Sequence, residues 1–324
     1  MAVRIKHRVE YVALRLMAGV LRLLPHAAAL AAAGGLAWFA FQVVRFRRGE
    51  ALRRIDAVFG AALTPRDKRR IAWQSLRNLC FNIAELMRAG SFTPTWMARH
   101  VDNYAPCIAR IRELVSAHGG LVLALPHFGN WDLAGIAAHQ AGIRIFSVAG
   151  VQHNTLVNDW LNRQRSVGLD IIPRGSAALR QIVRRLREDQ VFAILPDVRT
   201  RQPDLAIPFL GATANLGRGM AQFARVAGVP VLPVTVRRIG WFRHRFDVLE
   251  PLFPDKQAAA ADDVWRITAC VMTQIEAMIR ADPGQWFWYN KRWVLEPLLT
   301  DTPDAAPEPA AGNGPRSRSL QDTP

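Results

Sequence analysis

Apolar runs of strand length alternate with helical patterns from about residue 110 onward, and this alternation constrains the fold more than any other feature. The runs are LVLALP (121–126), IRIFSVAG (143–150), QVFAILPD (190–197) and VPVLPVTVRRI (229–239). Strands that are apolar along their whole length are buried on both faces, and intervening helices make neighbouring strands parallel. The sequence therefore predicts an α/β domain with three layers, α/β/α, around a mostly parallel sheet.

The start of the chain has a different character. An apolar stretch over residues 11–44 follows a basic start, and Pro25 divides it into two helices. The second helix, from about Ala27 to Val44, is uncharged over roughly the minimum length that crosses a hydrocarbon core. Three arrangements are open: the helices pack on the domain as a hairpin, lie in the membrane interface, or span the membrane once.

These patterns divide the chain into three regions. Residues 1–50 are expected to form helices that attach to a membrane, residues 51–300 the globular domain, and residues 301–324 a disordered tail. A basic cluster follows the second apolar helix: Arg45, Arg47, Arg48, Arg53 and Arg54. Because positive flanks stay on the cytoplasmic side, we expect the globular domain to face the cytoplasm.

The clearest single helix is predicted over residues 64–90. Thr64 is a good N-cap, Pro65 suits the first helical position, and Asp67 complements the positive end of the helix dipole. Gly90 can terminate the helix. Apolar residues inside it recur at helical spacing.

The charge balance points to an anionic partner. The 42 Lys and Arg against 26 Asp and Glu give a formal net charge of +16, which suits an anionic membrane, an acidic protein or nucleic acid. No helix-turn-helix, zinc-finger or RNP pattern is present in the sequence, so no nucleic-acid partner is predicted. Cys80, Cys107 and Cys270 have no C-x-x-C spacing, and we predict neither a disulfide framework nor a metal site.

The segment HFGNWD (127–132) directly follows the apolar run LVLALP. Ligands in open α/β sheets bind where strands end and helices begin, and His127 stands at that point. Asp132 opens the next helix, so its carboxylate can hold one imidazole nitrogen while the other accepts a proton from a substrate hydroxyl. The plainer alternative is a solvated loop histidine beside an aspartate that caps a helix.

HFGNWD also matches the H-x-x-x-x-(D/E) motif of glycerolipid-type acyltransferases. Over about residues 8–297 the chain more specifically resembles the late lipid A acyltransferases, which are lauroyl or myristoyl transferases of Gram-negative bacteria, and their relatives that acylate phosphatidylinositol mannosides. The segments that carry the resemblance are, in order, RRIDAVFG, NIAELMRAG, HNTLVNDWLNRQRSVG, LPDVRTRQPDLAIPFLGATANLGRG and PGQWFWYNKRW. The short motif is widely shared, whereas this order of segments is specific.

The resemblance implies roles for individual residues. His127 becomes the general base and Asp132 its partner. Arg165 matches an arginine that contributes to the family's active site. Asp197 matches a family aspartate, although Val198 stands where the family usually has Gln or another polar residue.

Substrate binding is assigned to Arg165, Asp197, Asn130 and Phe209. Arg165 could instead be a solvated arginine on a charged helix, and Asp197 could cap the turn after its strand. Phe209, in AIPFLG (206–211), either lines a groove for the acyl chain or belongs to the core.

The function implied by the resemblance is direct acyl transfer. The donor would be acyl carrier protein or acyl-CoA, and the acceptor a hydroxyl of an anionic glycolipid such as a lipid A precursor, at the inner (cytoplasmic) membrane. No metal or organic cofactor is expected. Alternatives are a phosphatidylinositol mannoside or aminolipid acceptor, and a non-catalytic membrane-binding protein that does not need His127. The segment QWFWYNKRW (285–293) suits an interfacial aromatic belt or a buried anchor.

Overall fold

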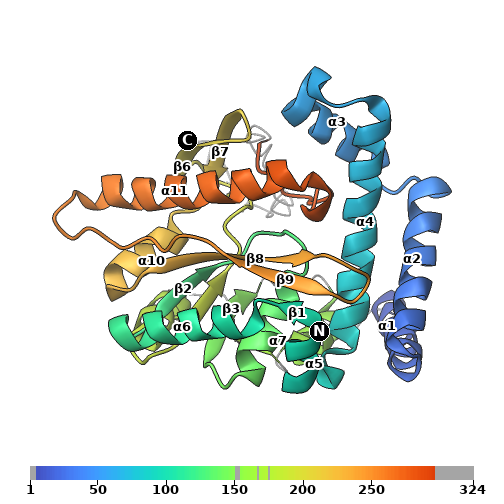
Figure 1. The fold of residues 1–324 in the computed structure, drawn as a ribbon, viewed down its shortest axis with the longest axis horizontal. Helices are drawn as coiled ribbons and strands as arrows, with labels where there is room; N and C mark the ends of the chain where they lie inside the picture. Colours follow the sequence, from blue (N-terminus) through green and yellow to red (C-terminus); the bar gives the residue numbers. More distant parts are fainter. Residues whose placement is uncertain (1–4, 150–153, 166–167, 174–175, 296–324) are drawn as a thin grey trace, which may run out of the picture.

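A seven-stranded sheet lies between two layers of helices in the computed structural model, which describes residues 5–149, 154–165, 168–173 and 176–295 (Figure 1). The strand order is β1-β9-β8-β2-β5-β3-β4. The strands are β1 (Val101–Asp102), β2 (Leu121–Ala124), β3 (Ile145–Ala149), β4 (Asp170–Pro173), β5 (Val191–Ile194), β8 (Val231–Arg238) and β9 (His244–Val248). Only β8 and β9 pair antiparallel among these neighbours. The predicted α/β fold with a mostly parallel sheet is confirmed.

Alternate residues of β2 enter two different cores. Leu121 and Leu123 pack into the core that contains α6 (Tyr104–His118) and α7 (Trp131–Gln140). Val122 and Ala124 pack into the core on the other face, which contains α9 (Ser176–Leu186), α10 (Gly219–Ala227) and α11 (Ala260–Ala281). The strand is apolar along its whole length because helices cover both of its faces.

The connections after β2 and β5 leave the same edge of the sheet side by side. The two strands are parallel neighbours, and Ala124 at the end of β2 is paired with Ile194 at the end of β5. The segment after β5 leads into a separate antiparallel hairpin of β6 (Leu205–Phe209) and β7 (Ala212–Leu216). Loops at the carboxyl edge of neighbouring strands are where such sheets place their ligand sites.

The helix predicted over residues 64–90 is α4 (Pro65–Met87). Its N-cap is Thr64, whose hydroxyl oxygen accepts a hydrogen bond from the Asp67 backbone N–H at 3.2 Å. The helix ends at Met87, and Gly90 lies in the short 3-10 turn that follows. α4 stands across one end of the sheet (Figure 1).

The N-terminal apolar stretch forms a helical hairpin that packs against α4. Pro25 separates α1 (Ile5–Leu23) from α2 (His26–Gln42), as predicted. The buried side of this hairpin shares a core with α4, made by Ala29, Leu30, Ala33, Phe81, Ala84 and Met87. Among the helices of the described residues, none is both long and apolar enough to cross a membrane. One side of the hairpin is thus docked on the domain.

Candidate active site

His127 and Asp197 meet at the carboxyl edge of the sheet. His127 follows β2, and Asp197 stands three residues after the end of β5. The His127 Nδ1 atom lies 2.9 Å from Asp197 Oδ1, and the His127 backbone N–H donates to Asp197 Oδ2 at 2.8 Å. One carboxylate thus fixes both the ring and the backbone of the histidine.

Asp197 is held as a carboxylate. Burial alone would raise its pKa, but the charge of His127 and the hydrogen bonds from His127 and Trp286 lower the pKa below its usual value. The Trp286 indole N–H donates to Oδ2 at 2.8 Å. Because an ionised carboxylate only accepts hydrogen bonds, Nδ1 donates to Asp197, and in the neutral imidazole Nε2 then keeps its lone pair.

The Nε2 side of the imidazole is available to a substrate. No residue of the described part of the chain forms a hydrogen bond with this nitrogen, and the His127 side chain retains 19% of its exposure. Trp131 contacts the ring edge-on, with ring centroids 5.1 Å apart. The ring is therefore oriented from one side and open on the other, which is the arrangement that a general base requires.

The predicted pairing of His127 with Asp132 must be corrected. The carboxylate that bonds to the ring at Nδ1 is Asp197, whereas Asp132 lies in the first turn of α7. Asp132 still belongs to the site, because it lines the same pocket as His127. The parallel pairing of β2 with β5 brings Asp197 to the histidine.

The structure does not bring the Asn130 side chain, which was predicted to bind substrate, into the pocket lining. Asn130 is only 2% exposed, and both polar atoms of its amide have protein partners. Its Oδ1 accepts from the Leu133 N–H at 3.2 Å, which makes it the N-cap of α7. Its Nδ2 donates to Glu85 Oε2 at 2.7 Å. Asn130 supports the loop that carries His127.

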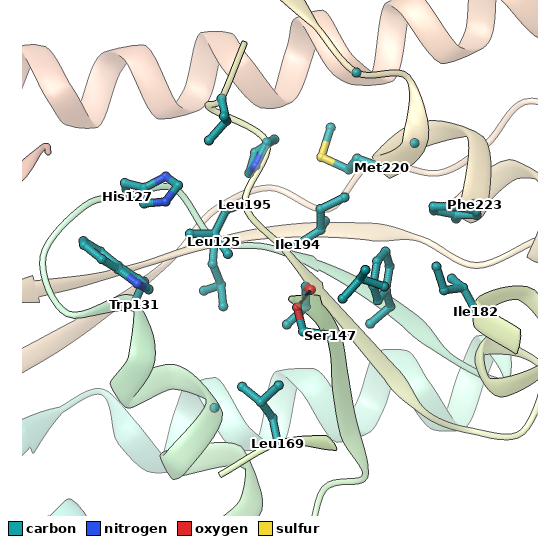
Figure 2. A pocket seen from close by; sticks show the side chains of 18 of the residues that line it. Leu125, His127, Trp131, Ser147, Leu169, Ile182, Ile194, Leu195, Met220 and Phe223 are labelled. Atoms are coloured by element: carbon teal, nitrogen blue, oxygen red, sulfur yellow. Dashed lines mark hydrogen bonds between the residues drawn. The ribbon is translucent and has the colours of Figure 1, made fainter. Parts of the chain in front are cut away.

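A deep pocket of about 730 Å³ opens beside His127. Figure 2 shows His127 and Trp131 on one side of it and Ile182 and Phe223 on the other. Most lining residues away from the histidine are apolar and come from β3, β5, α9 and α10. The volume lies in the range of small-molecule sites, and the lining suits a long apolar group.

Phe209 belongs to the core and does not line this pocket. It is 1% exposed and packs edge-on against Trp286, with ring centroids 5.9 Å apart. Of the two alternatives for Phe209, the structure has the core residue. Since Trp286 donates to Asp197, the ring of Phe209 supports the site from behind. Arg165 ends α8 (Thr155–Arg165), and its side chain lies outside the described residues.

The aromatic segment 285–293 forms a buried anchor. Trp286, Trp288, Tyr289 and Trp293 are each at most 4% exposed, so the alternative of an interfacial belt is wrong for these rings. The segment passes next to the loop of residues 127–130, because the Phe287 N–H donates to the His127 carbonyl at 2.9 Å. The contact between Trp286 and Asp197 does not follow from any local sequence pattern, although the density of aromatic residues in this segment is a signal of packing.

The cysteines are free, and burial makes two of them poor nucleophiles. It raises the pKa of Cys80 to about 11 and that of Cys107 to about 12. Within the described ranges, no three His, Cys, Asp or Glu side chains are grouped so as to hold a metal ion.

The site thus combines an imidazole held by a buried carboxylate with a pocket whose lining is largely apolar. Residues 4–294 match the family model described as bacterial lipid A biosynthesis acyltransferase. The chain belongs to this acyltransferase family.

Curated relatives are named phosphatidylinositol mannoside acyltransferase. Those of two Mycobacterium tuberculosis strains are 24% identical to the chain over 219 residues, which cover 65% of this chain and 66% of the relative. That of Mycolicibacterium smegmatis is 23% identical over 195 residues, covering 58% of this chain and 62% of the relative. The match thus extends over slightly less than two thirds of each relative.

Proposed function

We propose that this protein transfers a fatty acyl chain from the thioester of acyl carrier protein or coenzyme A to a hydroxyl of a glycolipid. The observation that carries the proposal is the His127–Asp197 pair at the mouth of the apolar pocket. The pocket is suited to hold the acyl chain, which places the thioester near Nε2. The family supports acyl transfer as the reaction.

The proposed step needs only one base. As the acceptor oxygen attacks the thioester carbonyl carbon, His127 Nε2 takes the hydroxyl proton. The C–S bond then breaks, the ester remains on the acceptor, and the imidazolium returns the proton to the departing sulfur. Asp197 stabilises the transient positive charge and keeps the ring in the required tautomer. Asp132 lines the same pocket.

We propose a lipid A precursor as the acceptor, because the family model carries that description. The names of the curated relatives favour a mannosylated inositol lipid as the second candidate. Mass spectrometry of membrane lipids from cells with and without the protein tests both. We expect one glycolipid class to lose the mass of one acyl chain when the protein is removed. An unchanged lipid profile would contradict an acyltransferase function in that cell.

The exposed face of the N-terminal hairpin is the proposed membrane contact, at the cytoplasmic side of the inner membrane. A row of exposed apolar residues follows one side of α1 at spacings of three and four: Val9, Val12, Leu16, Val20 and Leu23. On α2 the exposed side carries Leu36, Trp38 and Phe39. Exposed apolar faces of this extent mark interaction surfaces, and basic residues beside them favour anionic lipid.

Replacing Val12 and Leu16 by aspartate should weaken binding to vesicles that contain phosphatidylglycerol by at least about tenfold, because each side chain contributes roughly 1.5 to 3 kcal/mol when it is buried in lipid. Vesicle co-sedimentation measures the effect. Val226→Asp is the matched control, since Val226 is equally exposed but lies on α10, far from α1 in sequence. Undiminished binding of the double variant would show that another surface contacts the membrane.

Chain-length preference should depend on Phe223, not on Phe209. Phe223 lines the pocket and also the outer groove between α9 and α10, as do Leu179 and Gly219, so its ring lies where the two spaces adjoin. Phe223→Ala should let a chain longer by two methylenes gain roughly 1.6 kcal/mol of burial, which is more than tenfold in kcat/KM. Competition between acyl donors of different length, read by mass spectrometry of the product, measures the preference.

Phe209→Ala is the contrasting variant. It removes a core ring and should cost about 3 to 5 kcal/mol of stability, while the folded fraction keeps the original chain preference. A shift towards longer chains in Phe209→Ala, but not in Phe223→Ala, would place the end of the acyl site near β6.

A further inference from the structure

One buried face of α4 is polar. Ser75, Asn78, Asn82 and Glu85 follow one another at spacings of three and four, so they share a face of the helix. Each is at most 3% exposed. Buried polar side chains are retained where they have partners, and the partners of this row show what it holds in place.

Two members of the row bind the loop of residues 127–130. Asn82 Nδ2 donates to the Gly129 carbonyl at 2.5 Å. Glu85 Oε2 accepts from Asn130 Nδ2 at 2.7 Å. Neither Asn82 nor Glu85 lines the pocket beside His127, so any effect on the reaction must pass through the loop.

The opposite side of the loop is equally constrained. The Asn130 N–H donates to the Val236 carbonyl of β8 at 2.8 Å, and the Gly129 N–H donates to the Gln285 carbonyl at 2.9 Å. Gly129 has φ +60°, and a Cβ atom there would lie 1.8 Å from the Val236 carbonyl oxygen. The backbone two residues after His127 is therefore clamped between β8 and α4.

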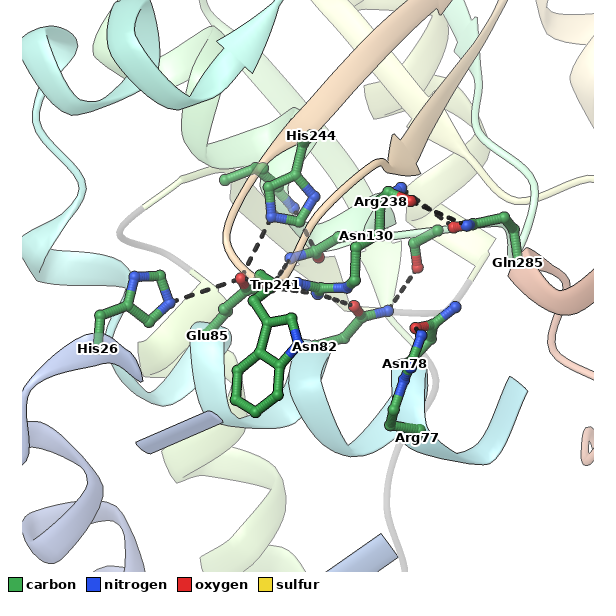
Figure 3. Close-up of polar contacts among 12 residues, drawn as sticks. His26, Arg77, Asn78, Asn82, Glu85, Asn130, Arg238, Trp241, His244 and Gln285 are labelled. Atoms are coloured by element: carbon green, nitrogen blue, oxygen red, sulfur yellow. Dashed lines mark hydrogen bonds and ion pairs between the residues drawn. The ribbon is translucent and has the colours of Figure 1, made fainter. Parts of the chain in front are cut away.

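Glu85 is the centre of this cluster (Figure 3). Burial alone would raise its pKa, but the charges of Arg238 and His244 hold the pKa well below its usual value. Arg238 bonds to both Glu85 oxygens and also to Asn82 Oδ1, the latter at 2.9 Å. His26, the first residue of α2, places Nε2 3.6 Å from the carboxylate. The cluster connects the N-terminal hairpin, α4, β8 and the loop of residues 127–130.

We propose that Asn82 and Glu85 are positioning residues for acyl transfer. By holding the carbonyl of Gly129 and the amide of Asn130, they set where the His127 imidazole stands relative to the thioester and the acceptor hydroxyl. This inference rests on the proposed function, because it needs His127 as the base. A displacement of the base by about an ångström can cost up to about a hundredfold in rate.

Asn82→Ala is the direct test. Glu85→Gln is less suitable, because it leaves the buried Arg238 without a countercharge and can prevent folding. Asn82→Ala removes an uncharged amide and leaves the pair of Glu85 with Arg238. We expect kcat per folded molecule to fall about tenfold or more, with the KM values of donor and acceptor within about twofold of wild type.

Asn78→Ala is the matched control. Asn78 is the same residue type on the same helix face, similarly buried, but it donates to the Gly284 carbonyl at 3.2 Å and not to the loop. We expect its melting temperature to fall about as much as that of Asn82→Ala, while kcat stays near wild type. Values of kcat near wild type in both variants, after correction for the folded fraction, would show that the row serves stability alone. A wild-type protein without turnover in this assay would overturn the proposed function, and the inference with it.

Discussion

His127→Ala should lower acyl transfer by about two to four orders of magnitude, as removal of a general base usually does. The side chain contributes the free Nε2, and no other ring nitrogen in the described chain combines an open face with a carboxylate partner at the pocket. Steady-state turnover with an acyl thioester and a glycolipid measures the loss. KM should change little, because the pocket walls remain.

The chain offers a matched histidine for this test. His139 is exposed on α7, one of the helices that carry the site, so His139→Ala should keep near-normal turnover. Vesicle binding should survive in both variants. Near-normal turnover of His127→Ala would exclude the proposed mechanism and would favour a membrane-binding protein without catalysis.

Asp197→Asn is expected to have the second-largest effect, a loss of about two to four orders of magnitude in kcat. An asparagine can donate its amide N–H to Nδ1, which moves the ring proton to Nε2 and removes the lone pair needed there. It also leaves the transient imidazolium without a countercharge. The variant keeps nearly the same shape, so the pocket and the KM values should be retained.

Asp132→Asn distinguishes the role of the Asp132 carboxylate from that of the Asp197 carboxylate. It leaves the bond between Nδ1 and Asp197 intact, so its loss should be clearly smaller than that of Asp197→Asn. Turnover of the two variants, measured under identical conditions, shows which carboxylate contributes more to the reaction. A larger loss in Asp132→Asn would mean that the carboxylate of the H-x-x-x-x-D motif acts directly on the reacting atoms.

The layered fold could be predicted because a strand that is buried on both faces is apolar along its whole length, which is visible in the local sequence. Strands such as β2 and β5 are continuous apolar runs, and α4 has both its cap and its helical spacing in the sequence. The short strand β4 and the hairpin of β6 and β7 were not predicted, since four or five residues of mixed polarity resemble loop segments. The order of the strands is not encoded in any local pattern.

For the site, too, individual residues could be predicted from the sequence, but their neighbours in space could not. His127 and Asp197 were both recognisable at strand ends, but only the pairing of Ala124 with Ile194 shows that these ends are neighbours. The spacing within HFGNWD favoured Asp132, because a motif reports proximity in sequence and not across a sheet. The polar residues of α4 recur at helical spacing in the sequence, yet the backbone and side-chain groups that they hold at the site lie 45 to 213 residues away.

Transfer of a labelled acyl chain by the purified protein is the most direct test of the proposed reaction. Wild type should give one glycolipid ester for each thiol released, seen as a single labelled product by mass spectrometry, and His127→Ala and Asp197→Asn should give almost none. Release of labelled free fatty acid without acylated glycolipid, or undiminished ester formation by His127→Ala, would contradict direct transfer with His127 as the base.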